Sequence, residues 1–138
     1  WGLAGLRVGM AFASEEIIEV MNKVKPPYNV NEASQQLALQ ALSNVAQVNS
    51  WIKETLAQRD KLVLTLRDLD FVLDIYPSDA NFILVKTTDA NGIYNFLVNQ
   101  GIIVRNRSKV ELCEGCLRIT VGTPTENDIL LQTLQNYK

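Results

Sequence analysis

The stretch LRITVGTPTE, residues 117–126, predicts a strand that leads directly into a helix. Alternation with period two places its three apolar residues on one face of the strand, with Arg118 and Thr120 on the other. Thr123 is followed by proline and then, three residues on, by Glu126. This is the pattern of a capping box with proline at the first helical position. The two patterns together indicate one strand and one helix of a layered sheet-and-helix domain.

The sequence before this stretch predicts the remainder of a small sheet. Strands are expected at residues 71–76, 81–86 and 102–105, with a helix between the second and the third. That helix begins at Thr88 or Asp89, and Gly101 follows its end. The order β, β, α, β, β, α over residues 71–138 predicts an α+β fold, with an open, mainly antiparallel sheet and helices on one face.

Residues 1–70 have a different character, because they read as one strand followed mostly by helix. We expect a buried strand at Leu6–Ala13 and a short helix from Ser14 to about Val24. A long helical stretch follows from Asn31 and breaks at Ser43-Asn44 or at Asn49-Ser50. A lone strand cannot satisfy its own backbone groups, so Leu6–Ala13 needs partner strands. The predicted organisation is two parts, residues 1–70 and 71–138.

The composition excludes several classes of function. The 138 residues carry 13 basic and 15 acidic side chains, and this net charge of −2 argues against a nucleic-acid binder or an anionic-membrane binder. The chain has no histidine, which rules out histidine-based catalysis and histidine zinc sites within it. No apolar run approaches the roughly 20 residues that span a bilayer. Any chemistry must use Arg, Lys, carboxylates, Tyr, Cys or a cofactor.

The two cysteines form one C-x-x-C pattern, Cys113 and Cys116, in a turn that leads into a strand. A redox pair is expected at a helix start instead, and a zinc site needs two more ligands than the pair supplies. We therefore expect ordinary thiols in a reducing compartment, the cytoplasm, and no metal site. Trp1 is not an initiator residue and no signal peptide follows it, so the chain is expected to be a fragment of a longer protein.

Three arginines within otherwise apolar strand patterns are the candidate functional residues. Arg7 interrupts a glycine-flanked apolar run, Arg105 lies at the end of a predicted strand, and Arg118 lies in the middle of another. Guanidinium groups bind carboxylate and phosphate through two oxygens at once. The residues therefore indicate either an anion-binding surface or arginines that lie on solvated faces or pair with structural acids, and they imply no reaction by themselves.

Five segments spread over nearly the whole chain resemble the histidinol-phosphate aminotransferase family, which is a pyridoxal-phosphate (PLP) dependent family of fold type I. They are GLAGLRVG (2–9), KPPYNVN (25–31), YPSDANF (76–82), GIIVR (101–105) and CLRITVGT (116–123). The resemblance implies that residues 1–70 are the C-terminal remnant of a large PLP-binding domain with a long linking helix. Residues 71–138 would then be the small C-terminal domain.

The resemblance also implies roles for individual positions. Arg7 matches the arginine that binds the PLP phosphate, and Arg118 matches the arginine that binds a substrate carboxylate or an equivalent anion. Arg105 matches a position implicated in holding the substrate phosphate, and Asn29 lies in a motif near the active site without an assigned contact. The lysine that forms the Schiff base with PLP is expected before Trp1, so the chain itself is expected to contain no catalytic residue and to be inactive.

The function implied for the whole protein is amino transfer between histidinol phosphate and 2-oxoglutarate, in histidine biosynthesis. Its expected cofactor is PLP, its partners are these small molecules, and its relatives act as homodimers. Two alternatives stay open. One is threonine-phosphate decarboxylase or another aminotransferase of the same superfamily, which would use similar arginines. The other is a non-catalytic α+β binding module.

Overall fold

The computed structural model describes residues 1–137, which form two compact units, one of residues 1–50 and one that begins at Trp51. The border between the units lies inside helix α3 (Val45–Arg67). The assignment of residues 1–70 to the remnant of a larger domain stays a prediction. Among the described residues, no helix combines the length and the apolar character needed to cross a membrane.

The first unit is built from short helices, whose predicted boundaries are confirmed. It contains the 3₁₀ turn η1 (Ala4–Leu6), α1 (Glu15–Val24), α2 (Glu32–Leu42) and the first turns of α3. The Asn31 side chain caps α2 by accepting a hydrogen bond from the Ser34 amide at 2.8 Å. The helical stretch breaks at Ser43-Asn44, which is one of the two predicted places.

The strand predicted at Leu6–Ala13 is wrong. Leu6 ends η1, Arg7 caps this turn in the left-handed region with φ 57°, and residues 8–13 form no regular structure. The physical reason is the missing hydrogen-bond partner. Within residues 1–137 the strands that pair all lie after residue 71, so the apolar run has no neighbour on which to build a ladder.

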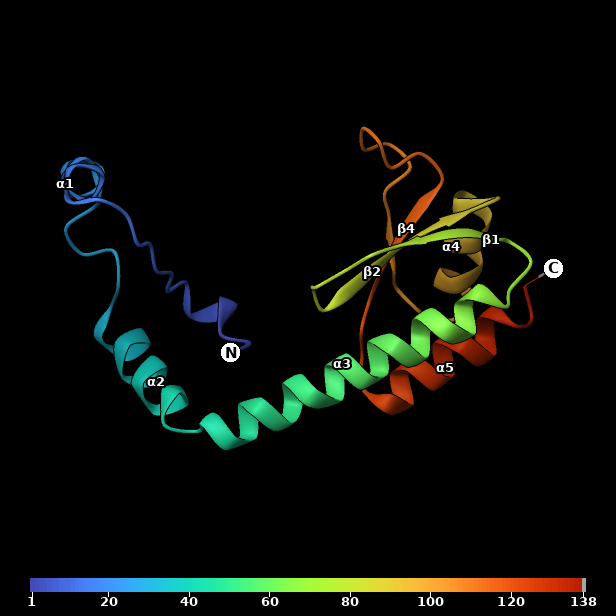
Figure 1. The fold of residues 1–138 in the computed structure, drawn as a ribbon, viewed down its shortest axis with the longest axis horizontal. Helices are drawn as coiled ribbons and strands as arrows, with labels where there is room; N and C mark the ends of the chain where they lie inside the picture. Colours follow the sequence, from blue (N-terminus) through green and yellow to red (C-terminus); the bar gives the residue numbers. More distant parts are fainter. Residues whose placement is uncertain (138) are drawn as a thin grey trace. The chain divides into compact units, whose positions relative to one another are not determined.

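The second unit contains a four-stranded sheet in the order β1-β2-β4-β3, with every neighbouring pair antiparallel (Figure 1). The strands are β1 (Val72–Tyr76), β2 (Phe82–Thr87), β3 (Arg105–Asn106) and β4 (Cys116–Thr120). Helix α4 (Ala90–Asn99) connects β2 to β3, and α5 (Pro124–Leu134) follows β4. The predicted α+β order β, β, α, β, β, α is confirmed.

Strand β3 is shorter than predicted and begins only at Arg105. The Ile102 amide donates to the Leu97 carbonyl at 2.9 Å, so it completes the end of α4 instead of pairing with a strand. Gly101, with φ 77°, makes this reversal possible because it has no Cβ. The predicted strand over residues 102–104 is therefore wrong, and only its last residue pairs.

The core of the second unit lies between the sheet and its helices, which cover one face. Period two directs Ile83 and Val85 of β2, and Leu117 and Ile119 of β4, toward the helices. Arg118 lies on the opposite, open face. Figure 1 shows α3 and α5 side by side below the sheet. The buried contributors from the three helices are Leu62, Leu66, Ala90, Ile93, Leu97, Leu130, Leu131 and Leu134, and those from the strands are Ile75, Ile83, Val85, Leu117 and Ile119.

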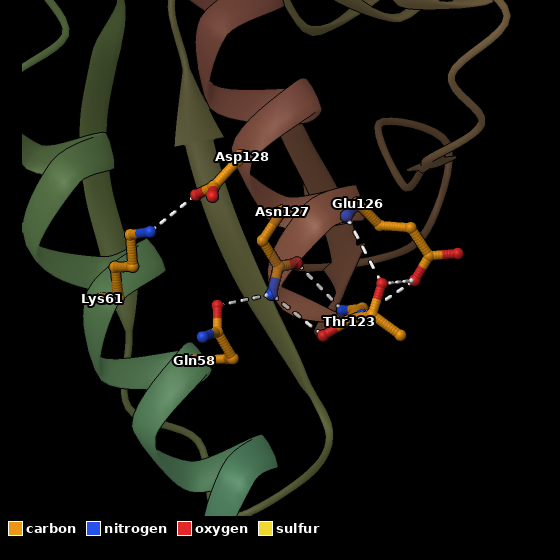
Figure 2. A network of polar contacts seen from close by, with 7 residues as sticks. Gln58, Lys61, Thr123, Glu126, Asn127 and Asp128 are labelled. Atoms are coloured by element: carbon orange, nitrogen blue, oxygen red, sulfur yellow. Dashed lines mark hydrogen bonds and ion pairs between the residues drawn. The ribbon is translucent and has the colours of Figure 1, made fainter.

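A polar network joins α5 to α3 at the end of β4 (Figure 2). Asn127 is 1% exposed, and its amide nitrogen donates to Gln58 Oε1 at 3.1 Å and to the Gly122 carbonyl at 2.9 Å. Its amide oxygen accepts from the Gly122 amide at 3.0 Å. The predicted capping box of Thr123 and Glu126 is confirmed beside it. This network holds the turn after β4, the strand that carries Arg118.

Candidate anion-binding site

Arg118 and Arg105 lie directly opposite each other on neighbouring strands of the open face. The register of β3 and β4 pairs Arg105 with Arg118, so both side chains leave the same side of the sheet. Arg118 is half-buried and Arg105 is exposed. Two like charges in this position repel each other, and an anion between them removes the repulsion.

Neither Arg105 nor Arg118 forms an ion pair in the described part of the chain. Its one ion pair joins Lys61 to Asp128 at 2.6 Å, on helices α3 and α5. The Arg118 Nε is buried and makes no hydrogen bond, although burying an unpaired polar group costs free energy. A carboxylate or a phosphate oxygen is the kind of group that satisfies such a donor.

The ring of Phe82 lies against Arg118. The Arg118 Cζ is 5.1 Å from the centroid of the ring, which is within the range of a cation–π contact. Phe82 begins β2 and pairs with Thr120, two residues beyond Arg118 on β4. Sequence reasoning missed this contact, because only the register of β2 against β4 brings the two side chains together.

The segment after β3 is tied to the sheet and to α4. The Arg107 amide donates to the Cys116 carbonyl at 2.9 Å, and Asn106 Nδ2 donates to Asn91 Oδ1 at 2.7 Å. The Ser108 amide donates to Asn106 Oδ1 at 2.9 Å. These contacts fix the backbone that presents Arg105.

Arg7 belongs to the first unit and is exposed. Its amide donates to the Ala4 carbonyl at 3.2 Å, which closes the η1 turn. Like the other two arginines, it forms no ion pair with an acid among residues 1–137. The structure thus brings two of the three predicted site residues together, whereas Arg7 belongs to the other unit. Asn29 lies exposed in the connection between α1 and α2.

Cys113 and Cys116 are free thiols at the two ends of a tight turn. The Cys116 amide donates to the Cys113 carbonyl at 3.0 Å. Burial raises the pKa of the Cys116 thiol, and the neighbouring Cys113 raises it further. Burial and a raised pKa both disfavour the thiolate form of Cys116, which is the form that acts as a nucleophile or a metal ligand.

Comparison with known proteins extends over almost the whole chain. Residues 1–134 match the family Aminotransferase class I and II. The chain is 53% identical, over 138 residues, to the histidinol-phosphate aminotransferase of Parabacteroides distasonis, which covers 100% of this chain and 40% of that protein. The chain therefore spans about 40% of the length of this curated relative.

Solved structures share its fold. A crystal structure of an inferred aminotransferase from Burkholderia pseudomallei K96243 is 34% identical with a TM-score of 0.90, and the match covers 99% of this chain and 41% of that chain. The histidinol-phosphate aminotransferase of Sinorhizobium meliloti, solved with pyridoxal-5'-phosphate, is 21% identical with a TM-score of 0.82, over 97% of this chain and 38% of that chain. The predicted fold class is confirmed. Because the match to the family Aminotransferase class I and II covers residues 1–134, the chain belongs to that family.

Proposed function

We propose that the whole protein is a cytoplasmic, PLP-dependent aminotransferase that transfers an amino group between histidinol phosphate and 2-oxoglutarate, in histidine biosynthesis. The observation that carries this proposal is the Arg105–Arg118 pair on the open face, which forms no ion pair among residues 1–137. Support for the substrate comes from the 53% identity to a histidinol-phosphate aminotransferase. The free thiols Cys113 and Cys116 fit a reducing compartment.

Each arginine of the pair has a proposed role in binding. Arg118 binds the carboxylate of the amino acid or the oxo acid, or the equivalent anion of the other substrate. Arg105, which is the more exposed of the two, binds the substrate phosphate. Their strands fix the two backbones, so each anion is held in one orientation relative to the reacting carbon.

Arg7 is proposed to hold the phosphate of PLP. Its donor set fits this group, because the guanidinium is exposed, carries no ion pair in the described residues and follows a glycine-containing turn. When bound, PLP supplies an electron sink for the bond that breaks at the amino-bearing carbon. The residues of this chain contribute the binding and orientation of charged groups, and the lysine that bonds to PLP is expected from the rest of the protein.

A homodimer is proposed for the whole protein. Large apolar side chains of the first unit are exposed, among them Met10 at 84%, Phe12 at 91% and Tyr28 at 95%. Exposed apolar surface of this kind supports burial by another part of the whole protein or by a second copy. Sedimentation of the whole protein as a monomer with full activity would contradict the dimer.

The experiment that tests the function compares two substrates on the purified whole protein with PLP. We expect glutamate to form from 2-oxoglutarate when histidinol phosphate is the amino donor. We expect no release of carbon dioxide from threonine phosphate, which is the substrate of the alternative decarboxylase. Decarboxylation without amino transfer would contradict the proposal, and so would the absence of both activities.

A further inference from the structure

We propose that Phe82 is a positioning residue for Arg118, whose guanidinium its ring holds in place without neutralising the charge. The inference rests on the proposed function, in which Arg118 binds a substrate carboxylate. Arginines are commonly oriented by an acid, but here the group in contact with the charge is an aromatic ring.

The contacts of Arg118 single out the ring. The Arg118 Cζ lies 5.1 Å from the Phe82 centroid, whereas the buried Nε has no hydrogen-bond partner. The guanidinium forms no ion pair within residues 1–137. Directly opposite Arg118 lie Arg105 on β3, which carries the same charge, and Leu84 on β2, which offers no polar side-chain group. Phe82 is thus the side chain that attracts the charge.

The backbone of Phe82 is anchored by the turn between β1 and β2. Ser78 Oγ donates to the Phe82 carbonyl at 2.6 Å and accepts from the Ala80 amide at 3.1 Å. Arg59 Nη1 of α3 donates to the Ala80 carbonyl at 3.0 Å. The start of β2 is therefore anchored to a helix of the same unit, which fixes the backbone from which the ring contacts Arg118.

A ring has a specific advantage over a carboxylate in this position. A carboxylate partner would accept hydrogen bonds from the guanidinium and would compete with the substrate for the same donors. Attraction to the face of a ring uses none of the five N–H donors of an arginine. Phe82 can therefore orient Arg118 and leave its full charge and its donors for the substrate anion.

The test uses the whole protein with PLP and compares Phe82→Leu, which removes the ring, with Phe82→Tyr, which keeps it. A cation–π contact of ordinary strength predicts that Phe82→Leu raises KM for 2-oxoglutarate by roughly 2- to 30-fold. We expect kcat to change by less than about twofold, because no reacting atom is touched. Phe82→Tyr should stay within about twofold of wild type in KM. Phe96→Leu is the matched control, because it removes a ring that packs on Tyr137.

A second readout does not depend on activity. In protein labelled with ¹⁵N-arginine, the Nε–Hε resonance of Arg118 is assigned by its loss in Arg118→Lys. We expect this resonance to carry a ring-current shift that Phe82→Leu removes and Phe82→Tyr retains. Phe82→Met, which fills the space without a ring, replaces the leucine variant if that variant does not fold.

The outcomes separate the two proposals. An Arg118 resonance that does not respond to loss of the ring overturns the positioning role, whatever the activity. Equal KM values for the leucine, tyrosine and wild-type proteins also overturn it, as does a fall in kcat and thermal stability with no change in KM. If the resonance responds but the protein transfers no amino group, the positioning contact stands and the proposed function fails.

Discussion

Replacing Asn127 by alanine tests the link between α5, α3 and the end of β4. The substitution removes three hydrogen bonds, at 2.9, 3.0 and 3.1 Å, from a side chain that is 1% exposed. The amide and the carbonyl of Gly122 both lose their hydrogen bond to the Asn127 side chain. At about 0.5–1.5 kcal/mol for each of the three hydrogen bonds, the expected loss is about 1.5–4.5 kcal/mol in the free energy of unfolding.

Urea unfolding measures this loss. With a slope of about 2 kcal/mol per molar urea, the midpoint should fall by about 1–2 M at unchanged slope. Gln58→Ala removes one of the three bonds and should cost about 1 kcal/mol. Lys61→Ala breaks an ion pair whose side chains are each 48% exposed, and it should cost less than about 1 kcal/mol. Hydrogen exchange at the Gly122 amide should become faster in Asn127→Ala alone. An alanine variant within about 0.5 kcal/mol of wild type, with Gly122 still protected, would refute this reasoning.

Three further outcomes are expected. Tyr137→Ala removes two edge-to-face aromatic contacts and should lower the free energy of unfolding by about 3–5 kcal/mol. Tyr137→Phe loses only the 3.2 Å hydrogen bond to Asp89 and should lower it by about 1 kcal/mol. The same urea titration measures both losses. Gly115→Ala should cost about 1–2 kcal/mol, because φ is 73° and the new Cβ would lie 3.2 Å from a carbonyl oxygen. Hydrogen bonds from Thr123 lower the pKa of the Glu126 carboxyl in the folded protein. The stability that this carboxylate gives the start of α5 is therefore complete above the ordinary pKa of about 4.3, and it is lost as the pH falls through the lower folded pKa. Glu126→Gln should abolish that acid dependence in amide exchange of the first turn of α5, and an unchanged dependence would contradict this cause.

The elements that could be predicted from the sequence are those determined by neighbouring residues. The capping box at Thr123 and the helix end at Gly101 depend on contacts within a few positions, and both are present as predicted. The run Leu6–Ala13 has a strand-like composition, but a strand also requires a partner that is distant in sequence. The local pattern carries no information about that partner, and the strand is absent from the described residues.

In the candidate site, too, the features set by neighbouring residues could be predicted, and those that depend on distant partners could not. Period two correctly predicted that Arg118 leaves the core face of its strand. That Arg105 lies directly opposite, and that the ring of Phe82 lies against Arg118, depends on the registers of β3 and β2 against β4. Register is set by long-range packing and by turn geometry, so neither contact could be predicted from spacing along the chain.

The central claim is that Arg118 binds a substrate anion during amino transfer, and steady-state kinetics of Arg118→Ala in the whole protein with PLP test it most directly. Lys61→Ala is the matched control, because it also removes one positive charge and lies on α3, outside the proposed site. Loss of a charged hydrogen-bonding partner predicts a fall in kcat/KM for 2-oxoglutarate of about 30-fold or more, with the control within about twofold of wild type. An Arg118→Ala protein as active as the Lys61→Ala control would contradict the account.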